Sequence, residues 1–207
     1  MAIAPGARKT QILHTLALML EQPQAARITT AALAARMQIS EAALYRHFAS
    51  KAQMFEGLID EIDHALFAIL DDIATQDQPG AEQARRIIVA LLRFAQDNRG
   101  LTRVLTGDAL VTEDKRLLDR INQITERVQS SLCQAMRNGI VDGSAPAHAD
   151  ALLQAGVFMH LILGKWLRFA QSGWRMTPND GIAAELAWLI PQRPLLDSGT
   201  RHTLDRA

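Results

Sequence analysis

Apolar residues recur at intervals of three and four along most of the chain, and this spacing predicts a succession of helices. The predicted helices span about residues 7–21, 28–37, 40–48, 50–75, 81–97, 100–107, 112–138, 147–172 and 177–190. Strand-like alternation of apolar and polar residues is missing, and aromatic residues make up only 5% of the sequence. We therefore expect an all-α fold.

Residues 28–48 have the pattern of two short helices joined by a tight turn. Leu33 and Met37 form an apolar pair on the first helix, residues 38–39 make the turn, and Ser40 is a good N-cap for the second helix. This arrangement is typical of a helix-turn-helix motif, whose second helix enters the major groove of DNA. The turn contains no glycine.

The outward side of the second helix carries alanines beside longer polar side chains. Alanine lets the backbone approach another surface, and the longer side chains supply hydrogen bonds and charge, which suits a groove about 12 Å wide. Arg46 faces either the DNA or an acid of its own chain. Thr29 or Thr30 caps the first helix, and both belong to the predicted DNA-binding set. We expect the phosphates to be contacted by Thr30, Tyr45, His47 and Lys51, and the bases by Ser40, Glu41, Ala42, Ala43 and Arg46.

Charge is distributed unevenly, although the formal net charge is zero. Residues 1–54 contain six Lys or Arg and two Asp or Glu, a balance of +4, so the remainder carries −4. A basic end joined to an acidic body is typical of a protein of which only one end meets phosphates. A chance fluctuation is the alternative explanation.

The residues from Ile28 to Phe55 resemble the N-terminal DNA-binding domain of the TetR family of transcriptional regulators. The resemblance is carried by Ala-Leu-Tyr-Arg-His-Phe at 43–48 and by Ser-Lys-x-x-Met-Phe at 50–55. It implies a homodimer of all-helical subunits that binds a palindromic site in double-stranded DNA.

Further segments resemble one branch of that family, the nucleoid occlusion factors. Members of this branch bind chromosomal palindromes and, when bound to DNA, antagonise assembly of the division protein FtsZ over the nucleoid. The resemblance thus implies a cytoplasmic, nucleoid-associated protein with FtsZ as a partner. The alternative is a ligand-responsive TetR-family repressor, whose body binds a small-molecule effector. The segments that carry the resemblance are residues 16–21, 27–30, 40–48, 100–107 and 120–123.

In the nucleoid occlusion branch, the FtsZ tail docks in a groove between the long joining helix and the next helix. Among the aligned groove positions, only Asn98 keeps the residue of the branch, while Glu61 replaces an aromatic residue and Asp97 an arginine. FtsZ tails are acidic, so we expect the attraction to come from Arg93, Arg99 and Arg103. The partner contacts that the resemblance implies are Ile69, Arg93, Asn98 and Arg99.

Residues 147–172 form the most apolar predicted helix, and this helix has apolar residues on two faces. A body of this size readily covers only one face, so we expect the other to pack against a second copy of the chain. Two helices from each chain then make a four-helix interface, as the TetR resemblance also implies. The predicted interface consists of Leu152, Gly156, Met159, Leu163, Trp166 and, from the last helix, Leu186.

The sequence shows no pattern of a catalytic or cofactor site. Metal-ligand spacing of the HExxH kind, phosphate-binding loops and dinucleotide fingerprints are missing, so we expect no enzyme, no metal and no cofactor. Cys133 is the single cysteine and is expected as a small apolar residue. His160 is expected in the core or interface, with a ligand pocket as the alternative. No apolar run has the roughly 18 residues of a membrane span, so we expect no membrane contact.

These observations divide the chain into three parts. We expect a helix-turn-helix DNA-binding domain over residues 1–54, a helical core and dimerisation domain over 55–190, and a disordered tail over 191–207. Gly57 lies inside the helix that joins the first two parts. We expect it at a close-packing site, with a flexible point as the alternative.

Overall fold

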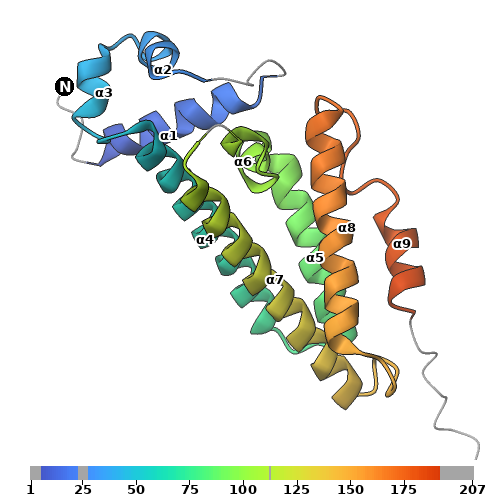
Figure 1. Ribbon diagram of the computed structural model, residues 1–207. Helices are drawn as coiled ribbons and strands as arrows, with labels where there is room; N and C mark the ends of the chain where they lie inside the picture. The colour runs from blue at the N-terminus through green and yellow to red at the C-terminus, as the bar shows by residue number, and fades with distance from the viewer. Residues whose placement is uncertain (1–5, 23–27, 112, 192–207) are drawn as a thin grey trace, which may run out of the picture.

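The computed structural model describes residues 6–22, 28–111 and 113–191, and within these ranges the regular structure is helical throughout. The all-α prediction is therefore confirmed. Figure 1 shows the first three helices gathered at one end of an elongated body. These are α1 (Ala7–Leu20), α2 (Thr30–Arg36) and α3 (Glu41–Tyr45). The body contains α4 (Lys51–Ala74), α5 (Gly80–Asp97), α6 (Arg99–Leu105), the short 3-10 helix η2 (Asp108–Leu110), α7 (Lys115–Val141), α8 (Ala151–Gln171) and α9 (Ile182–Leu189).

Two glycines bring α5 and α7 into close contact at the end of the body that is remote from α3. A Cβ at Gly80 would lie 2.1 Å from the backbone nitrogen of Gly139, so neither helix tolerates a side chain at this crossing. The sequence prediction ended the second of these helices before Gly139, which was wrong, because this glycine serves close packing and α7 continues to Val141.

Asp142 follows α7 and caps the neighbouring helix α5. Its Oδ2 accepts a hydrogen bond of 2.7 Å from the backbone N–H of Gly80. Burial acts to raise the pKa of this carboxyl, but the hydrogen bonds donated by Ser144 and Gly80 outweigh it, so the pKa of Asp142 lies below its ordinary value. The charged carboxylate thus satisfies a backbone donor that the first turn of α5 leaves unpaired.

The centre of the body is filled by large side chains from α5, α7 and α8. Trp166 is almost fully buried, and its indole N–H donates to the carbonyl of Leu91 at 3.2 Å. Phe158 and Phe169 are also buried on the same side of α8. This inward face of α8 is therefore part of the core of the single chain.

The end of the body nearest the first three helices is joined to α1 by close contacts at two glycines. A Cβ at Gly100 in α6 would lie 2.0 Å from the carbonyl oxygen of Ala17, and a Cβ at Gly57 in α4 would lie 2.9 Å from the side chain of Leu13. Gly57 is thus a close-packing site, as expected. These contacts fix α1 against both α4 and α6.

The predicted boundary between residues 54 and 55 falls inside α4, which is continuous from the helix-turn-helix into the body. The two parts therefore share a helix, and the division stays a proposal. Of the predicted tail, only Pro191 is described, and residues 192–207 lie outside the described ranges. Among the described residues, no helix combines the length and apolar character needed to cross a membrane.

Candidate nucleic-acid interface and neighbouring surfaces

Side-chain caps and a left-handed residue set the geometry of the helix-turn-helix. Thr29 caps α2 by accepting from the backbone N–H of Ala32 at 3.1 Å, and Ser40 caps α3 by accepting from Ala43 at 3.1 Å. Both N-caps were predicted, and Thr29 rather than Thr30 is the cap of α2. Gln38 adopts a φ of 56°, so it takes the left-handed position that glycine commonly occupies after a helix.

Buried side chains decide which face of α3 points outward. Leu44 and Phe48 pack inward together with Leu33 of α2. Around this helix, Ser40, Glu41, Ala42, Tyr45 and Arg46 are exposed, while Ala43 and His47, and Thr30 of α2, are half-buried. Most of the predicted base-facing residues are therefore accessible from outside.

The exposed polar side chains on this surface are connected to one another. Thr30 Oγ1 donates to Glu41 Oε2 at 2.8 Å, and the hydroxyl of Tyr45 donates to Thr30 Oγ1 at 3.3 Å. This chain of hydrogen bonds links the start of α2 to both ends of α3. Among the described residues, Arg46 makes no ion pair, which favours its DNA-facing interpretation over pairing with an acid of its own chain.

Two lysines flank the exposed surface of α3. Lys51 is the first residue of α4, and its Nζ lies 2.5 Å from Glu113 Oε1, beyond η2. Lys9 of α1 lies with its Nζ 5.5 Å from the ring centroid of Phe48. Lys9 was not among the predicted contacts, because only the packing of α1 brings it beside α3.

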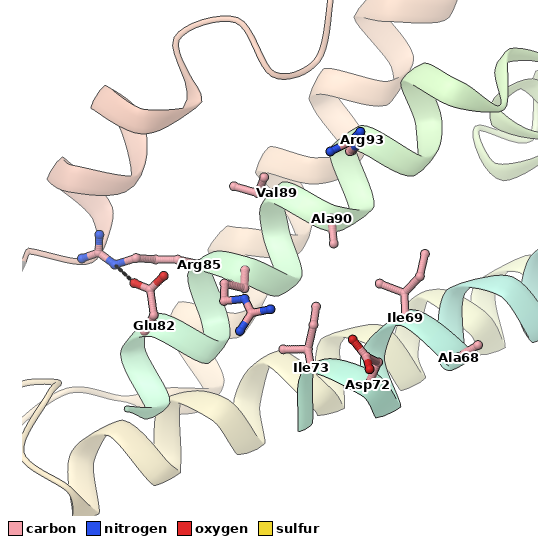
Figure 2. A pocket seen from close by; sticks show the side chains of 10 residues that line it. Ala68, Ile69, Asp72, Ile73, Glu82, Arg85, Val89, Ala90 and Arg93 are labelled. Carbon is pink, nitrogen blue, oxygen red and sulfur yellow. Dashed lines mark ion pairs between the residues drawn. The ribbon is translucent and has the colours of Figure 1, made fainter. Parts of the chain in front are cut away.

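A groove of 740 Å³ runs between α4 and α5. Figure 2 shows Ile69 and Ile73 of α4 facing Ala90 of α5 across this space. The groove therefore has an apolar floor, with Val89 and Arg93 also among its lining residues. Of the predicted partner contacts, Ile69 and Arg93 line this groove.

Only one cation of the groove, Arg93, is among those expected from the sequence. Arg86 lines it, and its Nη1 donates to Gln78 Oε1 at 2.8 Å and also to Gln76, both of which are neutral partners. Arg93 forms an ion pair of 3.6 Å with Asp97, and both side chains are largely exposed. Sequence reasoning missed Arg86, although it lies one helical turn before Ala90 on the same face of α5.

Three of the expected residues do not contribute to the groove. Asn98 occupies the corner between α5 and α6, where its side-chain amide donates to the carbonyl of Phe94 at 2.8 Å. Arg99 follows it at the first position of α6 and is also absent from the groove lining. Arg103 is buried, with its guanidinium 5.5 Å from the ring of Trp174. The attraction assigned to Arg103 is therefore wrong.

Glu61 of α4 lies on the side of that helix where α1 packs. Burial raises the pKa of its carboxyl, and the nearby imidazole of His14 acts in the opposite direction. Glu61 does not line the groove, so its negative charge lies away from the groove surface.

The structure corrects the predicted dimer face. Met159, Trp166 and Leu186 are buried within the single chain, so they cannot face a partner, whereas Leu152 is exposed and Gly156 and Leu163 are half-buried. Two apolar stripes run along α8 at similar spacing, and the pattern alone did not show which one meets the core. The exposed stripe consists of Leu153, Val157, His160, Gly164 and Leu167.

Comparison with protein families and known proteins covers nearly the whole chain. Residues 15–58 match the model of bacterial regulatory proteins of the tetR family, and residues 82–193 match the SlmA-like model described as a tetracyclin repressor-like C-terminal domain. The nucleoid occlusion factor SlmA of Vibrio atlanticus (strain LGP32) is 40% identical over 186 residues, which are 89% of this chain and 95% of the relative. SlmA of Shewanella sediminis is 37% identical over 199 residues, which are 96% of this chain and 100% of that protein.

Solved structures of TetR-type regulators share the fold at low sequence identity. FadR from Bacillus subtilis, in complex with stearoyl-CoA, has a TM-score of 0.72 at 14% identity over 89% of this chain and 99% of FadR. AibR, in complex with isovaleryl coenzyme A and operator DNA, has a TM-score of 0.70 at 19% identity over 90% of this chain and 100% of AibR.

A capped helix-turn-helix on an elongated all-helical body defines a TetR-type DNA-binding regulator. Within the TetR family, the chain belongs to the family of SlmA nucleoid occlusion factors. The predicted resemblance is confirmed at both levels. These relatives are DNA-binding regulators rather than enzymes.

Ala42 provides a direct test of the outward face of α3. We expect Ala42→Glu to reduce operator binding by at least about 100-fold, because a carboxylate would meet phosphates and base acceptors, while the exposed position leaves folding intact. Ala74→Glu is the matched control, because Ala74 is an exposed alanine at the end of α4 that is remote from α3. Fluorescence anisotropy with operator DNA and thermal melts are the measurements. Normal binding by Ala42→Glu would show that another surface reads the DNA.

Proposed function

We propose that this protein binds palindromic sites on the chromosome as a homodimer and, from these sites, antagonises FtsZ assembly over the nucleoid. The observation that carries the proposal is the identity of about 40% with SlmA proteins over nearly the full length of both chains. It follows that the protein acts in the cytoplasm, at the nucleoid.

The proposed DNA contacts follow from the exposed face of α3. Ala42 and Arg46 are exposed where the helix would enter the major groove, and Tyr45 and His47 lie toward its end. Lys51 at the start of α4 is proposed to meet the phosphate backbone. Lys9 adds a second cation beside α3, on the same end of the molecule.

The proposed FtsZ site is the groove between α4 and α5. An acidic, flexible tail requires cations beside an apolar floor, and the groove offers Arg86 and Arg93 beside Ile69 and Ala90 (Figure 2). The hydrogen-bond partners of Arg86 are neutral, so its positive charge is available to a carboxylate. The ion pair between Arg93 and Asp97 is exposed and contributes under about 1 kcal/mol, so an acidic partner readily replaces it.

The proposed dimer face consists of the exposed stripe of α8 and the outer side of α9. Trp188 of α9 is 81% exposed, which is unusual for so large an apolar side chain. Gly164 of α8 faces open space, since a Cβ there would meet nothing within 4 Å. A glycine inside a helix costs about 1 kcal/mol relative to alanine, and a closely approaching partner helix would account for it.

A ligand-responsive repressor is the second candidate function, favoured by the acyl-CoA compounds bound to FadR and AibR. Those likenesses concern the fold alone. In this chain, Trp166 and Phe158 occupy the middle of the body, and the groove between α4 and α5 is open to solvent. These features favour the nucleoid occlusion role.

Genome-wide mapping of bound sites distinguishes the two functions. A nucleoid occlusion factor is expected at many palindromes around the chromosome, with few near the terminus, where division must proceed. A single site beside the protein's own gene would instead identify a local repressor. The control is the Ala42→Glu variant, which should lose every specific peak.

Val157 tests the dimer face. We expect Val157→Glu to give a folded monomer, because the residue is 43% exposed in the single chain and the new charge would be buried only in the dimer. Sedimentation velocity measures the mass. Operator affinity should also fall, because a monomer contacts only one half-site and therefore binds weakly. Val141→Glu, at a valine that is 89% exposed at the end of α7, is the matched control. An unchanged dimer in Val157→Glu would place the interface elsewhere.

Arg93 tests the FtsZ groove. We expect Arg93→Glu to weaken binding of an FtsZ tail peptide to the DNA-bound dimer by roughly fivefold at low salt, and by less at physiological salt. Arg137→Glu, on an exposed part of α7, is the control for the change in net charge. Isothermal titration at two salt concentrations provides the measurement. Equal effects of both variants would remove the groove as the binding site.

A further inference from the structure

An ion pair joins the body of the protein to a lysine beside the helix-turn-helix. Lys51 Nζ lies 2.5 Å from Glu113 Oε1, although the two residues are 62 positions apart in the sequence. The side chain of Glu113 is 11% exposed and that of Lys51 is 26% exposed, so the pair is partly shielded from water. The lysine also lies over the ring of Phe55, at 5.6 Å from its centroid.

The local backbone fixes Glu113 in this position. Its N–H donates to the carbonyl of Leu110 at 2.9 Å, which closes a turn after η2. The next residue, Asp114, caps α7 by accepting from the N–H of Arg116 at 3.0 Å. The carboxylate of Glu113 thus stands beside the start of a long helix, where the helix dipole favours a negative charge.

A carboxylate bound to Lys51 has the acceptor chemistry of a DNA phosphate. Both groups are anions with oxygen acceptors, and an ammonium group with three donors binds either of them. If Lys51 contacts the backbone of DNA, its ammonium group must either exchange Glu113 for a phosphate or interact with both anions at once.

We propose that Glu113 is an intramolecular phosphate mimic that competes with DNA for Lys51 and thereby lowers DNA affinity. The inference rests on the proposed phosphate contact of Lys51. It adds a residue of the body, remote in sequence from the helix-turn-helix, to those that set DNA affinity. Because Glu113 competes for a backbone contact, it reduces binding to all sequences alike.

The Glu113→Gln variant removes the competing charge and keeps an acceptor oxygen for the lysine. We expect it to bind operator and unrelated DNA about fivefold more tightly at low salt, and the salt slope to steepen by up to about one unit. Lys51→Ala should weaken both DNAs and flatten the slope by about one unit. In the Lys51→Ala background, Glu113→Gln should have no further effect, since the two residues act through one contact.

Asp63→Asn is the matched control. Asp63 pairs with Arg127 at 2.6 Å across α4 and α7, so the variant removes one negative charge from a comparable ion pair further along the body. About 18 Å of helix separates it from Lys51, beyond the Debye length of about 8 Å at physiological salt, so its DNA affinity should stay unchanged there. Thermal melts and sedimentation verify that each variant is a folded dimer.

The outcomes separate this inference from the proposed function. Tighter binding by Glu113→Gln that disappears in the Lys51→Ala background supports the competition. The inference is overturned if Glu113→Gln binds DNA unchanged or more weakly, or if it raises DNA affinity equally in the Lys51→Ala background. The proposed phosphate contact of Lys51 would then still stand. Unchanged affinity of Lys51→Ala itself would overturn the phosphate contact together with the inference.

Discussion

The close backbone approach of α1 to α6 determines how the DNA-binding end sits on the body. Gly100 lies against the carbonyl of Ala17 so tightly that any side chain there would displace one helix from the other. The loop after α8 adds a second tie, because the indole N–H of Trp174 donates to the carbonyl of Glu21 at 2.7 Å. Since α2 packs on both α1 and α3, these two contacts help to fix the orientation of the proposed recognition helix.

This orientation matters because a dimer reads two half-sites at once. The two recognition helices of such proteins bind about one helical turn of DNA apart, roughly 34 Å. Their separation depends on the proposed face of α8 and α9, on the packing of α8 in the core and on the contact between α6 and α1. A displacement at Gly100 would therefore change the fit to both half-sites without altering any DNA-contacting residue.

Local sequence signals predicted most of the helices, but they did not predict which helix faces pack against one another. The N-caps Thr29 and Ser40 follow from chemistry within three residues, as does the extent of most helices. The left-handed Gln38 had no such signal, since a glycine is the usual mark of that conformation. On α8, two stripes of similar apolarity left the core side undecided, and Trp166 was placed on the wrong face. Glu113 gave no signal at all, because only the folded body brings it to Lys51.

Four polar side chains at the proposed DNA-facing end already have partners within the chain. Thr30, Glu41 and Tyr45 share a chain of hydrogen bonds, and Lys51 is paired with Glu113. If these side chains contact DNA as proposed, they exchange existing partners for DNA groups, so each such contact contributes less than it would from a free side chain. Backbone contacts carry no sequence information, whereas contacts to the bases do. In the proposed competition, Glu113 lowers the backbone contribution for all sequences alike, so the proposed base contacts of α3 make up a larger share of the total binding free energy.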